Sequence, residues 1–356
     1  MRNSRVPILP LAFAAAGLAL AAAPRAGAQD VYVSDFDNSQ ILDYTQSGTL
    51  ARTFSSGGLF VNPDGLAFVG NALDVSAQDP ATGYGVIYQY SLSSPAAAPT
   101  LFATDTGGVL SGLAYAGGNL YAADSQQGRI LAYNTQTGAQ AASFGSGTLT
   151  SPVGLAFKNG SLYVADSGAN DVVRYSDSGA SQGTFITAGS GGLQMPGELA
   201  FDPAGNLLVA SGQGTNNGGA VDRFDSAGTP SPSSGKPGAV FASDPGLFNP
   251  YGLAVSPTGA VFVGDRNSNQ LNGSGGGGHF DQFDAGGALV QSVAFNGGNG
   301  NPYGLVLGPA APAAAPEPSG AVSLAVSAAG LALLGLRLGL RRRSRAQPCS
   351  LKDVSS

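Results

Sequence analysis

One unit recurs along most of this chain, and its cleanest copy is residues 151–175, SPVGLAFKNGSLYVADSGANDVVRY. The copy contains an apolar run, an Asn-Gly turn signal at Asn159, a second apolar run that ends at Asp166, and a third run that ends at Tyr175. A fourth run follows near residues 183–186. Short β-rich runs joined by tight turns predict four antiparallel strands that form one small sheet.

The copies repeat at a nearly constant interval. Each contains an equivalent leucine, and these leucines are Leu66, Leu113, Leu155, Leu199, Leu253 and Leu305. Consecutive members are separated by 47, 42, 44, 54 and 52 residues. This is the period of a β-propeller blade or a similar array of repeats.

The two ends of the repeat region decide between a closed ring and an open array. The last copy, residues 302–307, has a first strand and no second, whereas residues 31–35, 40–44 and 50–54 read as strands two, three and four without a first. Together they complete one blade, and a shared blade closes a ring and removes exposed sheet edges. We therefore predict an all-β, six-bladed β-propeller of four-stranded antiparallel blades. An open solenoid is the alternative.

These units resemble NHL-type repeats, whose pattern is Pro-x-Gly-Leu/Ile-Ala, then Leu/Ile-Tyr-Val-Ala-Asp, then Ile-x-x-Tyr/Phe. The resemblance covers roughly residues 30–307 and implies one propeller domain over residues 29–307. The Asp that ends the second strand is missing near residues 73–77 and 207–211, and the usual basic residue before the third strand survives only as Arg129. NHL-like propellers include protein- and RNA-binding modules, and their relatives include metal-dependent lyases and lactonases. The absence of Trp argues against WD-type repeats.

Residues 1–28 have the pattern of a signal peptide. Arg2 and Arg5 precede an apolar run over residues 8–23, and Ala26 and Ala28 form an A-x-A cleavage site. We expect the mature chain to begin near Gln29 and to be exported. An uncleaved N-terminal anchor is the alternative.

The C-terminal region has three parts after the Pro/Ala linker of residues 308–315. Within residues 316–345, the motif Pro316, Glu317, Pro318 precedes an apolar segment of about 320–340, which Arg341, Arg342 and Arg343 follow. Such a segment is long enough to span a bilayer as a transmembrane helix, with the arginines on the cytoplasmic side. Residues 346–356 would then form a cytoplasmic tail.

This order of motif, apolar segment and arginine cluster resembles the PEP-CTERM sorting signal. The resemblance implies recognition by an exosortase-type sorting enzyme in a Gram-negative bacterium that makes extracellular polysaccharide. The chain would be anchored in the inner membrane through the C-terminal helix before processing, and would then reach the cell surface or the extracellular matrix. Arg337 lies earlier than the family pattern and residues 346–356 extend beyond it, which leaves cleavage of the tail open. A plain C-terminal anchor is the alternative.

The charge of the repeat region restricts the partners. Residues 30–307 contain 20 acidic and 7 basic side chains, a net charge of −13. Such a surface repels phosphate backbones, so we predict no nucleic-acid partner. Exopolysaccharide, a matrix protein or cations are better suited, although acidity that only maintains solubility is the alternative. The single Cys349 lies outside the repeats, which therefore have no disulfide and no thiol nucleophile.

Antiparallel pairing places the start of each first strand and the end of each second strand at the same face of the ring. We expect this face to gather the second-strand acids Asp35, Asp124, Asp166 and Asp265, and the residues Asp64, Tyr251 and Tyr303 that precede first strands. Glu198 belongs there too, because it replaces the Gly of the other copies. Tyrosines can stack on sugar rings.

The ligand-face candidates are Asp35, Asp64, Glu198, Tyr251 and Tyr303. We predict no bound cofactor, with one Ca²⁺ as the open alternative, because carboxylate oxygens are ligands that Ca²⁺ prefers. Its weak candidate ligands are Glu198, Asp124, Asp166 and Asp265. The structural alternative is that each second-strand Asp accepts backbone N–H groups of its own loop, in an Asx-turn.

The sequence offers little for catalysis, and we assign no catalytic residue. Zinc lyases on this fold need several histidines, and His279 is the single His. We therefore predict a non-catalytic binding module. A Ca²⁺-dependent hydrolase or lyase of the lactonase type and a protein-assembly scaffold are the alternatives.

Overall fold

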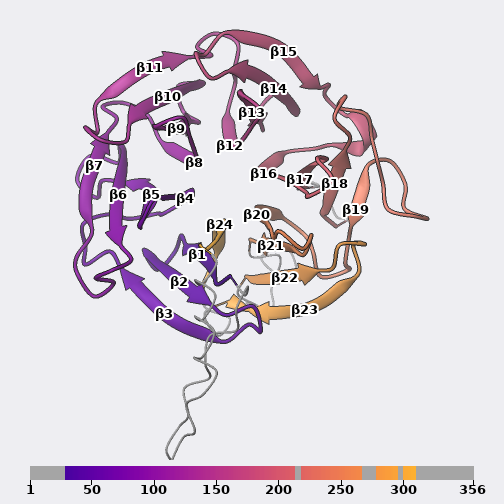
Figure 1. The fold of residues 1–356 in the computed structure, drawn as a ribbon, viewed down its shortest axis with the longest axis horizontal. Coiled ribbons are helices and arrows are strands. Elements are labelled where there is room, and N and C mark those ends of the chain that lie inside the picture. Colours follow the sequence, from indigo (N-terminus) through magenta and orange to yellow (C-terminus); the bar gives the residue numbers. More distant parts are fainter. Residues whose placement is uncertain (1–28, 213–217, 267–277, 296–299, 310–356) are drawn as a thin grey trace, which may run out of the picture. The chain divides into compact units, whose positions relative to one another are not determined.

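The computed structural model describes residues 29–212, 218–266, 278–295 and 300–309. They form six four-stranded antiparallel sheets arranged around a central axis (Figure 1). The predicted six-bladed propeller is therefore confirmed, and the open solenoid is excluded because the first and last described strands pair in one sheet. A short 3₁₀ turn, η1 (Ser190–Gly192), precedes one inner strand.

Each blade runs from an inner strand at the axis to an outer strand at the rim. The shared blade comprises β24 (Pro302–Leu307), β1 (Val31–Asp35), β2 (Gln40–Tyr44) and β3 (Leu50–Ser55). The next two are β4 (Leu66–Val69), β5 (Ala72–Gln78), β6 (Gly85–Ser91), β7 (Thr100–Thr104), and β8 (Leu110–Ala116), β9 (Asn119–Asp124), β10 (Arg129–Asn134), β11 (Gln140–Phe144).

The remaining three blades follow in chain order around the ring. They are β12 (Pro152–Lys158), β13 (Ser161–Asp166), β14 (Asp171–Ser176), β15 (Ser181–Ile186), then β16 (Pro196–Phe201), β17 (Leu207–Ser211), β18 (Ala220–Phe224), β19 (Val240–Ala242), and last β20 (Pro250–Val255), β21 (Val261–Asp265), β22 (His279–Phe283), β23 (Leu289–Ala294).

The shared blade is closed by the strand at the C-terminal end of the repeats. β24 supplies the inner strand that the N-terminal segments lack, and it pairs with β1 in the register Val31↔Leu307 and Val33↔Leu305. Because both ends of the repeat region are fixed in one sheet, the ring is closed and no blade is left incomplete.

The Pro-x-Gly motif at the start of the inner strands has a packing reason. In β12 the pairing shifts between Pro152 and Leu155, so the strand bulges where the Gly lies. A side chain at Gly112 or Gly154 would clash with a backbone carbonyl of the next blade, that of Val153 or Gly197. The same holds at Gly65, Gly252 and Gly304. Glycine is thus required where neighbouring blades approach most closely, and the sixth equivalent position holds Glu198.

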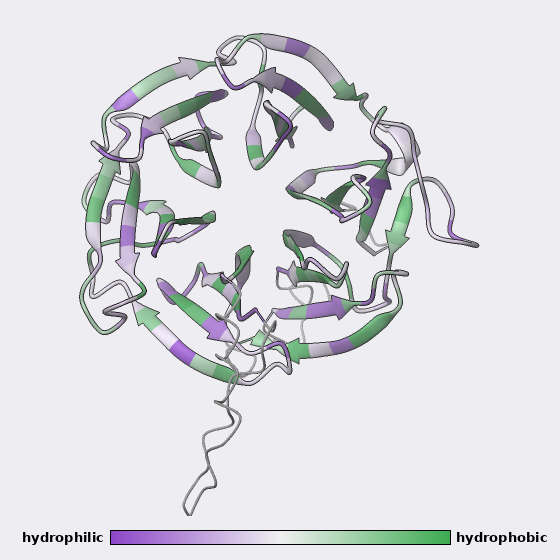
Figure 2. Cartoon of the chain, viewed as in Figure 1, coloured by the Kyte–Doolittle hydropathy of each residue, from purple (hydrophilic) through white to green (hydrophobic). Residues whose placement is uncertain are grey.

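The core is divided among the interfaces between blades. Six clusters of buried hydrophobic side chains each combine residues of adjacent blades, as where Leu120 and Ile87 pack together or where Tyr121 packs with Leu162. Figure 2 shows hydrophobic residues recurring in every blade around the ring. Each blade therefore depends on both neighbours for burial, which makes closure of the ring a condition of stability.

The predicted signal peptide, linker, sorting segment and cytoplasmic tail lie outside the described residues, apart from Gly308 and Pro309 of the linker. Within the described ranges, no helix has the length and apolar character needed to cross a membrane.

Candidate functional site

In five of the six blades, the residue that ends the second strand fastens the segment that enters the inner strand of the same blade. The carboxylate of Asp166 accepts the N–H groups of Thr150 at 2.7 Å and Ser151 at 2.8 Å. Asp265 does the same with Phe248 and Asn249, at 3.0 and 2.6 Å. Asp166 also accepts the N–H groups of Gly168 and Ala169 in its own loop, at 3.2 and 3.3 Å, as the structural alternative expects, but its shorter contacts are those with the preceding segment.

The same fastening occurs where the repeat lacks its Asp. Ser211 Oγ accepts the N–H of Gln194 at 3.2 Å, and Gln78 Oε1 accepts the side-chain amide of Asn62 at 3.0 Å. In the shared blade, Asp35 Oδ1 accepts the N–H of Asn301 at 3.3 Å. The position therefore selects an acceptor rather than a carboxylate, which explains why two copies depart from the repeat pattern.

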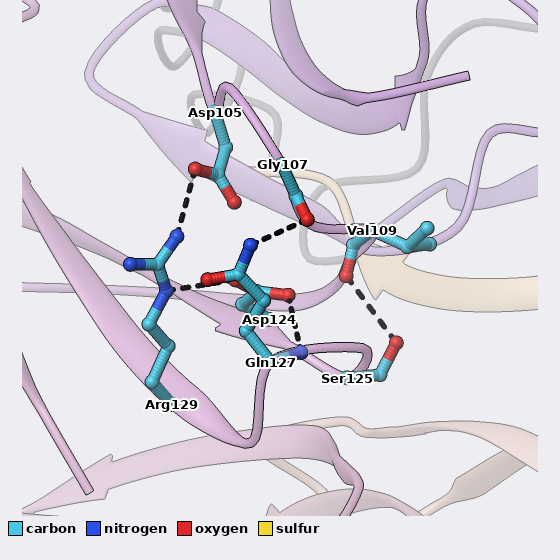
Figure 3. A network of polar contacts seen from close by, with 7 residues as sticks. All are labelled: Asp105, Gly107, Val109, Asp124, Ser125, Gln127 and Arg129. Carbon is cyan, nitrogen blue, oxygen red and sulfur yellow. Dashed lines mark hydrogen bonds and ion pairs between the residues drawn. The ribbon is translucent and has the colours of Figure 1, made fainter. Parts of the chain in front are cut away.

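Asp124 is held in a different way, by an arginine (Figure 3). Arg129 Nε donates to Asp124 Oδ2 at 2.8 Å, and Arg129 Nη2 donates to Asp105 Oδ1 at 2.9 Å. Burial and the neighbouring Asp124 raise the pKa of Asp105, whereas Arg129 opposes that rise. Since Asp105 follows β7 and Asp124 ends β9, Arg129 links two adjacent blades.

The structure does not bring the second-strand acids together. Asp35, Asp124, Asp166 and Asp265 each end the second strand of a different blade, and all four are buried. Within the described part of the chain, no three His, Cys, Asp or Glu side chains are grouped closely enough to hold a metal ion. The donor sets seen here therefore do not fit a Ca²⁺ site built from Asp124, Asp166 and Asp265.

The ligand-face candidates nearest the axis do meet. Tyr251, on the inner strand β20, donates its hydroxyl to Asp64 Oδ2 at 3.3 Å. Asp64 precedes β4, so this hydrogen bond passes over the shared blade between them. Both side chains are buried, with residue exposures of 8% and 7%. Burial raises the pKa of Asp64 to about 6, against the lowering effect of Arg266.

Arg266, which follows Asp265, lies over two of the tyrosines. Its guanidinium carbon is 3.9 Å from the ring centroid of Tyr251 and 4.7 Å from that of Tyr303. Phe36 stacks on Tyr303 with a centroid distance of 4.2 Å and an interplanar angle of 16°. We call Phe36, Asp64, Tyr251, Arg266 and Tyr303 the mouth cluster. It combines residues from three blades at the face predicted from the sequence.

Two polar atoms of the mouth cluster are left without a partner. Asp64 Oδ1 and Arg266 Nε are buried and form no hydrogen bond with the described residues. The hydroxyl of Ser111 is near enough to Asp64 to lower the pKa of its carboxyl by hydrogen bonding, but in the geometry seen here this hydroxyl donates to Ser125 Oγ at 3.3 Å. An acceptor and a donor thus lie unpaired in one place, which is unusual for buried polar groups.

Glu198 lies in the central channel near the mouth cluster. It is the third residue of the inner strand β16, within the buried part of that strand, and its residue exposure is only 8%. Burial raises its pKa well above the usual range, the charge of Asp64 raises it further, and the backbone N–H groups of Leu199 and Leu155 act in the opposite direction. Two carboxyl groups therefore share the channel in an environment that disfavours ionisation of both.

A cavity in the central channel opens toward the face opposite the mouth cluster. It has a volume of about 620 Å³ and is bordered by Glu198, by the leucine of every inner strand, and by residues 200–203 and 254–257. Asp64, Tyr251 and Tyr303 do not border it. Of the predicted site residues, only Glu198 therefore faces this cavity.

His279, at the start of β22, lies between two acidic side chains. Its Nε2 lies 3.3 Å from Asp281 Oδ2 and 3.7 Å from Asp265 Oδ2. Burial lowers the pKa of His279, but the hydrogen bond and the charge of Asp281 outweigh burial, so the pKa is raised. These two acids favour a protonated imidazole, whereas a general base needs a neutral one.

The sequence analysis did not identify Arg266, Phe36 and Ser111 as members of the site. Arg266 is adjacent to the second-strand Asp265, which places it on the correct face. Its contact with Tyr303 arises only because the next blade around the ring contains β24, and Phe36 reaches the same tyrosine from the loop after β1. Ring closure therefore creates these contacts.

Comparisons with known proteins show the fold. No family model matches the chain, and no curated protein matches it. A chain of the nidogen/laminin complex superposes with a TM-score of 0.62 at 16% identity, covering 79% of this chain and 99% of that chain. A protein of unknown function from Bacteroides caccae gives 0.58 at 12% identity, with coverages of 79% and 98%. Virginiamycin B lyase from Staphylococcus aureus gives 0.49 at 13% identity, with coverages of 79% and 82%.

Proposed function

We propose that this chain is an exported β-propeller that binds a neutral polysaccharide at the mouth cluster without turning it over. The observation that carries the proposal is the pair of buried, unpartnered atoms, Asp64 Oδ1 and Arg266 Nε. A buried polar group without a partner costs about 1–3 kcal/mol, and a ligand that satisfies both atoms recovers that free energy.

The chemistry of the pair matches a hydroxyl-rich ligand. A sugar hydroxyl both donates and accepts hydrogen bonds, so adjacent hydroxyls can donate to the Asp64 carboxylate and accept from the Arg266 guanidinium. The guanidinium is held in place by the rings of Tyr251 and Tyr303. In this proposal the tyrosines position Arg266 in addition to any contact they make with a sugar ring.

The surrounding charge favours a neutral ligand over an anionic one. A uronate or phosphate could pair with Arg266, but the carboxyl groups of Asp64 and Glu198 lie in the same channel. The net charge of −13 over residues 30–307 adds long-range repulsion. The same negative charges repel the phosphate backbone of a nucleic acid.

Delivery to the cell surface completes the proposal. Residues 1–28 act as a signal peptide and residues 316–345 as a PEP-CTERM sorting signal that an exosortase-type enzyme recognises. The apolar segment of about 320–340 holds the chain in the inner membrane before processing. The basis is the order of Pro316, Glu317, Pro318, the apolar segment and the arginines in the sequence.

A Ca²⁺-dependent hydrolase or lyase of the lactonase type is the second candidate, and one observation favours it. Asp64 and Glu198 are two carboxyl groups whose charges interact in the channel. A divalent cation between them would stabilise their ionised forms. Turnover that requires Ca²⁺ and is lost in Glu198→Gln would establish this function in place of binding alone.

A matrix protein is the other class of ligand for a non-catalytic propeller, and a scaffold for protein assembly is the corresponding function. The nidogen/laminin structure contains a propeller-like chain in a protein–protein complex. The unpaired donor and acceptor favour the polysaccharide, because a hydroxyl ligand satisfies both within a small contact area.

The test is a titration of the purified chain with exopolysaccharide from the producing cells. We expect binding that falls at least tenfold in Arg266→Met. Arg174→Met is the matched control, because Arg174 also lies over an aromatic ring, 5.9 Å from the centroid of Phe185, and its buried Nε also has no partner. Equal losses in both variants, or no binding by the unaltered chain, would reject the mouth cluster as the site.

A further inference from the structure

The cavity of about 620 Å³ opens on the face opposite the mouth cluster. Its opening lies among the turns that join inner and second strands, where Asp202, Pro203, Ser256 and Pro257 border it. Its lining extends along the channel as far as Glu198. Glu198 and Asp202 are separated by four residues of nearly extended chain, so the recess is about 13 Å deep.

The wall of this cavity is a ring of six leucines. They are the equivalent residues of the repeat, one from each inner strand: Leu66, Leu113, Leu155, Leu199, Leu253 and Leu305. Each keeps a small exposure of 3–6%, whereas the residues that pair with them in the second strands, such as Val75 opposite Leu66 and Val164 opposite Leu155, have 0%. The ring therefore presents apolar surface to the cavity instead of being sealed in the core.

The charged side chains that border the cavity are both acidic. Glu198 lies at the inner end and Asp202 at the opening, and no Lys, Arg or His borders the cavity within the described residues. Asp202 is engaged by its own turn, since it accepts the N–H and the side-chain amide of Asn206, each at 2.8 Å. Lys158 places its ammonium 4.4 Å from the ring centroid of Phe201 but does not border the cavity.

Glu198 is the charged group that a ligand can contact at the inner end of the cavity. It is the single charged side chain at a position that is Gly in the other five copies, and its carboxyl lies beside one of these glycines, since a Cβ at Gly112 would lie 3.1 Å from Glu198 Oε1. Its carboxyl is buried, and the charge of a second acid, Asp64, disfavours its ionised form further. Only backbone N–H groups favour the ionised form. A buried carboxylate without a cation is costly, so a positively charged ligand group would be stabilised there.

We infer that this leucine-lined cavity binds a primary amine that carries a linear apolar chain, with the ammonium group at Glu198 and the chain within the leucine ring. An ammonium donates hydrogen bonds to the carboxylate and supplies the missing positive charge. The apolar chain removes leucine surface from water, worth roughly 0.8 kcal/mol for each buried methylene. This site opens on the other face from the mouth cluster, and although the charge of Asp64 acts on Glu198, the inference does not depend on the polysaccharide proposal.

The test is isothermal titration of the purified chain with octylamine, and with octanol and octanoate as probes of the same chain length. We expect octylamine to bind at least tenfold more tightly than either probe. In Glu198→Gln, which keeps the shape of the side chain, octylamine should lose at least tenfold in affinity while octanol is unchanged. Asp177→Asn, a change at an exposed acid that does not border the cavity, should retain the full affinity.

Several results would overturn the inference. Octanoate binding as tightly as octylamine would show that charge does not select the ligand. Undiminished octylamine affinity in Glu198→Gln, with a melting temperature equal to that of the unaltered chain, would show that the ammonium does not lie at Glu198. Absence of octylamine binding by the unaltered chain would show that the cavity does not take this class of ligand.

Discussion

The carboxylate of Asp166 accepts the backbone N–H of Thr150 at 2.7 Å, and so joins the end of a second strand to the segment that enters the inner strand of the same blade. An acceptor at this position recurs around the ring, as Asp265 and Ser211 show. The acids that look like a metal-ligand set in the sequence therefore hold the blades in shape.

Replacing Asp166 with Ala should destabilise the propeller by roughly 2–4 kcal/mol, because the buried N–H groups of Thr150 and Ser151 lose a charged acceptor. Asp177→Ala is the control at an exposed acid and should change stability by less than about 0.5 kcal/mol. Thermal unfolding followed by circular dichroism measures both. Equal effects of the two changes would contradict a fastening role for Asp166.

Removing the arginine that joins two blades should have a comparable effect. Arg129→Met leaves Asp105 and Asp124 buried without their cation, and loss of one partner of a buried ion pair typically costs about 3–5 kcal/mol. Because Arg129 is 24% exposed, we expect the lower part of that range.

A second change tests the cause of that loss. Adding Asp105→Asn to Arg129→Met removes one of the two uncompensated charges, so it should restore part of the stability. A double-mutant cycle on thermal unfolding measures this coupling. Strict additivity of the two changes would show that Asp105 and Arg129 do not stabilise each other.

The channel acids predict the direction of the pH dependence. The pKa of Asp64 is raised to about 6 in the folded chain, from 3.8 in the unfolded chain, so the folded state binds its proton more tightly. The contribution of Asp64 to stability is therefore fully present below pH 4 and is lost as the pH rises through 6, by roughly 3 kcal/mol at about 1.4 kcal/mol for each pKa unit. Asp74, Asp222 and Asp265, with pKa values also raised to about 6, act in the same direction.

Asp64→Asn isolates the contribution of one group. The variant should unfold at a higher temperature than the unaltered chain above pH 6, and the two should converge near pH 4. Melting temperatures between pH 4 and pH 8 provide the comparison. A difference that grows toward low pH would have the wrong sign and would reject the raised pKa of Asp64.

The sorting signal predicts a change in mass. The surface form of the protein should lack residues 1–28 and the part of the chain that follows the Pro316, Glu317, Pro318 motif. Replacement of these three residues by Ala should leave a longer, membrane-bound form. Intact mass spectrometry of the surface and membrane fractions distinguishes the two, and an unprocessed surface form would support a plain anchor instead.

The architecture was predictable because the repeat encodes it locally. The period, the turn signals and the divided blade at the two ends of the repeats are all sequence features, and together they predict six blades and their closure. The departures at Gln78 and Ser211 were harder to interpret, because different side chains supply the same acceptor.

The site was only partly predictable. Alternation of strands places Asp64, Tyr251 and Tyr303 at one face, but the contact of Arg266 with Tyr303 depends on which blades are neighbours around the axis. The sequence showed that Glu198 breaks the glycine rule. It could not show that this side chain borders a cavity opening on the opposite face, because the closeness of the blades, not the repeat pattern, determines the shape of the channel.

The most direct test of the central claim measures retention and turnover in one sample. Labelled exopolysaccharide from the producing cells is incubated with the purified chain, with and without a chelator, and both the bound fraction and newly formed chain ends are determined. The account predicts retention that the chelator does not reduce, with no new chain ends. Chain ends that form only with Ca²⁺ and disappear in Glu198→Gln would contradict it and establish an enzyme.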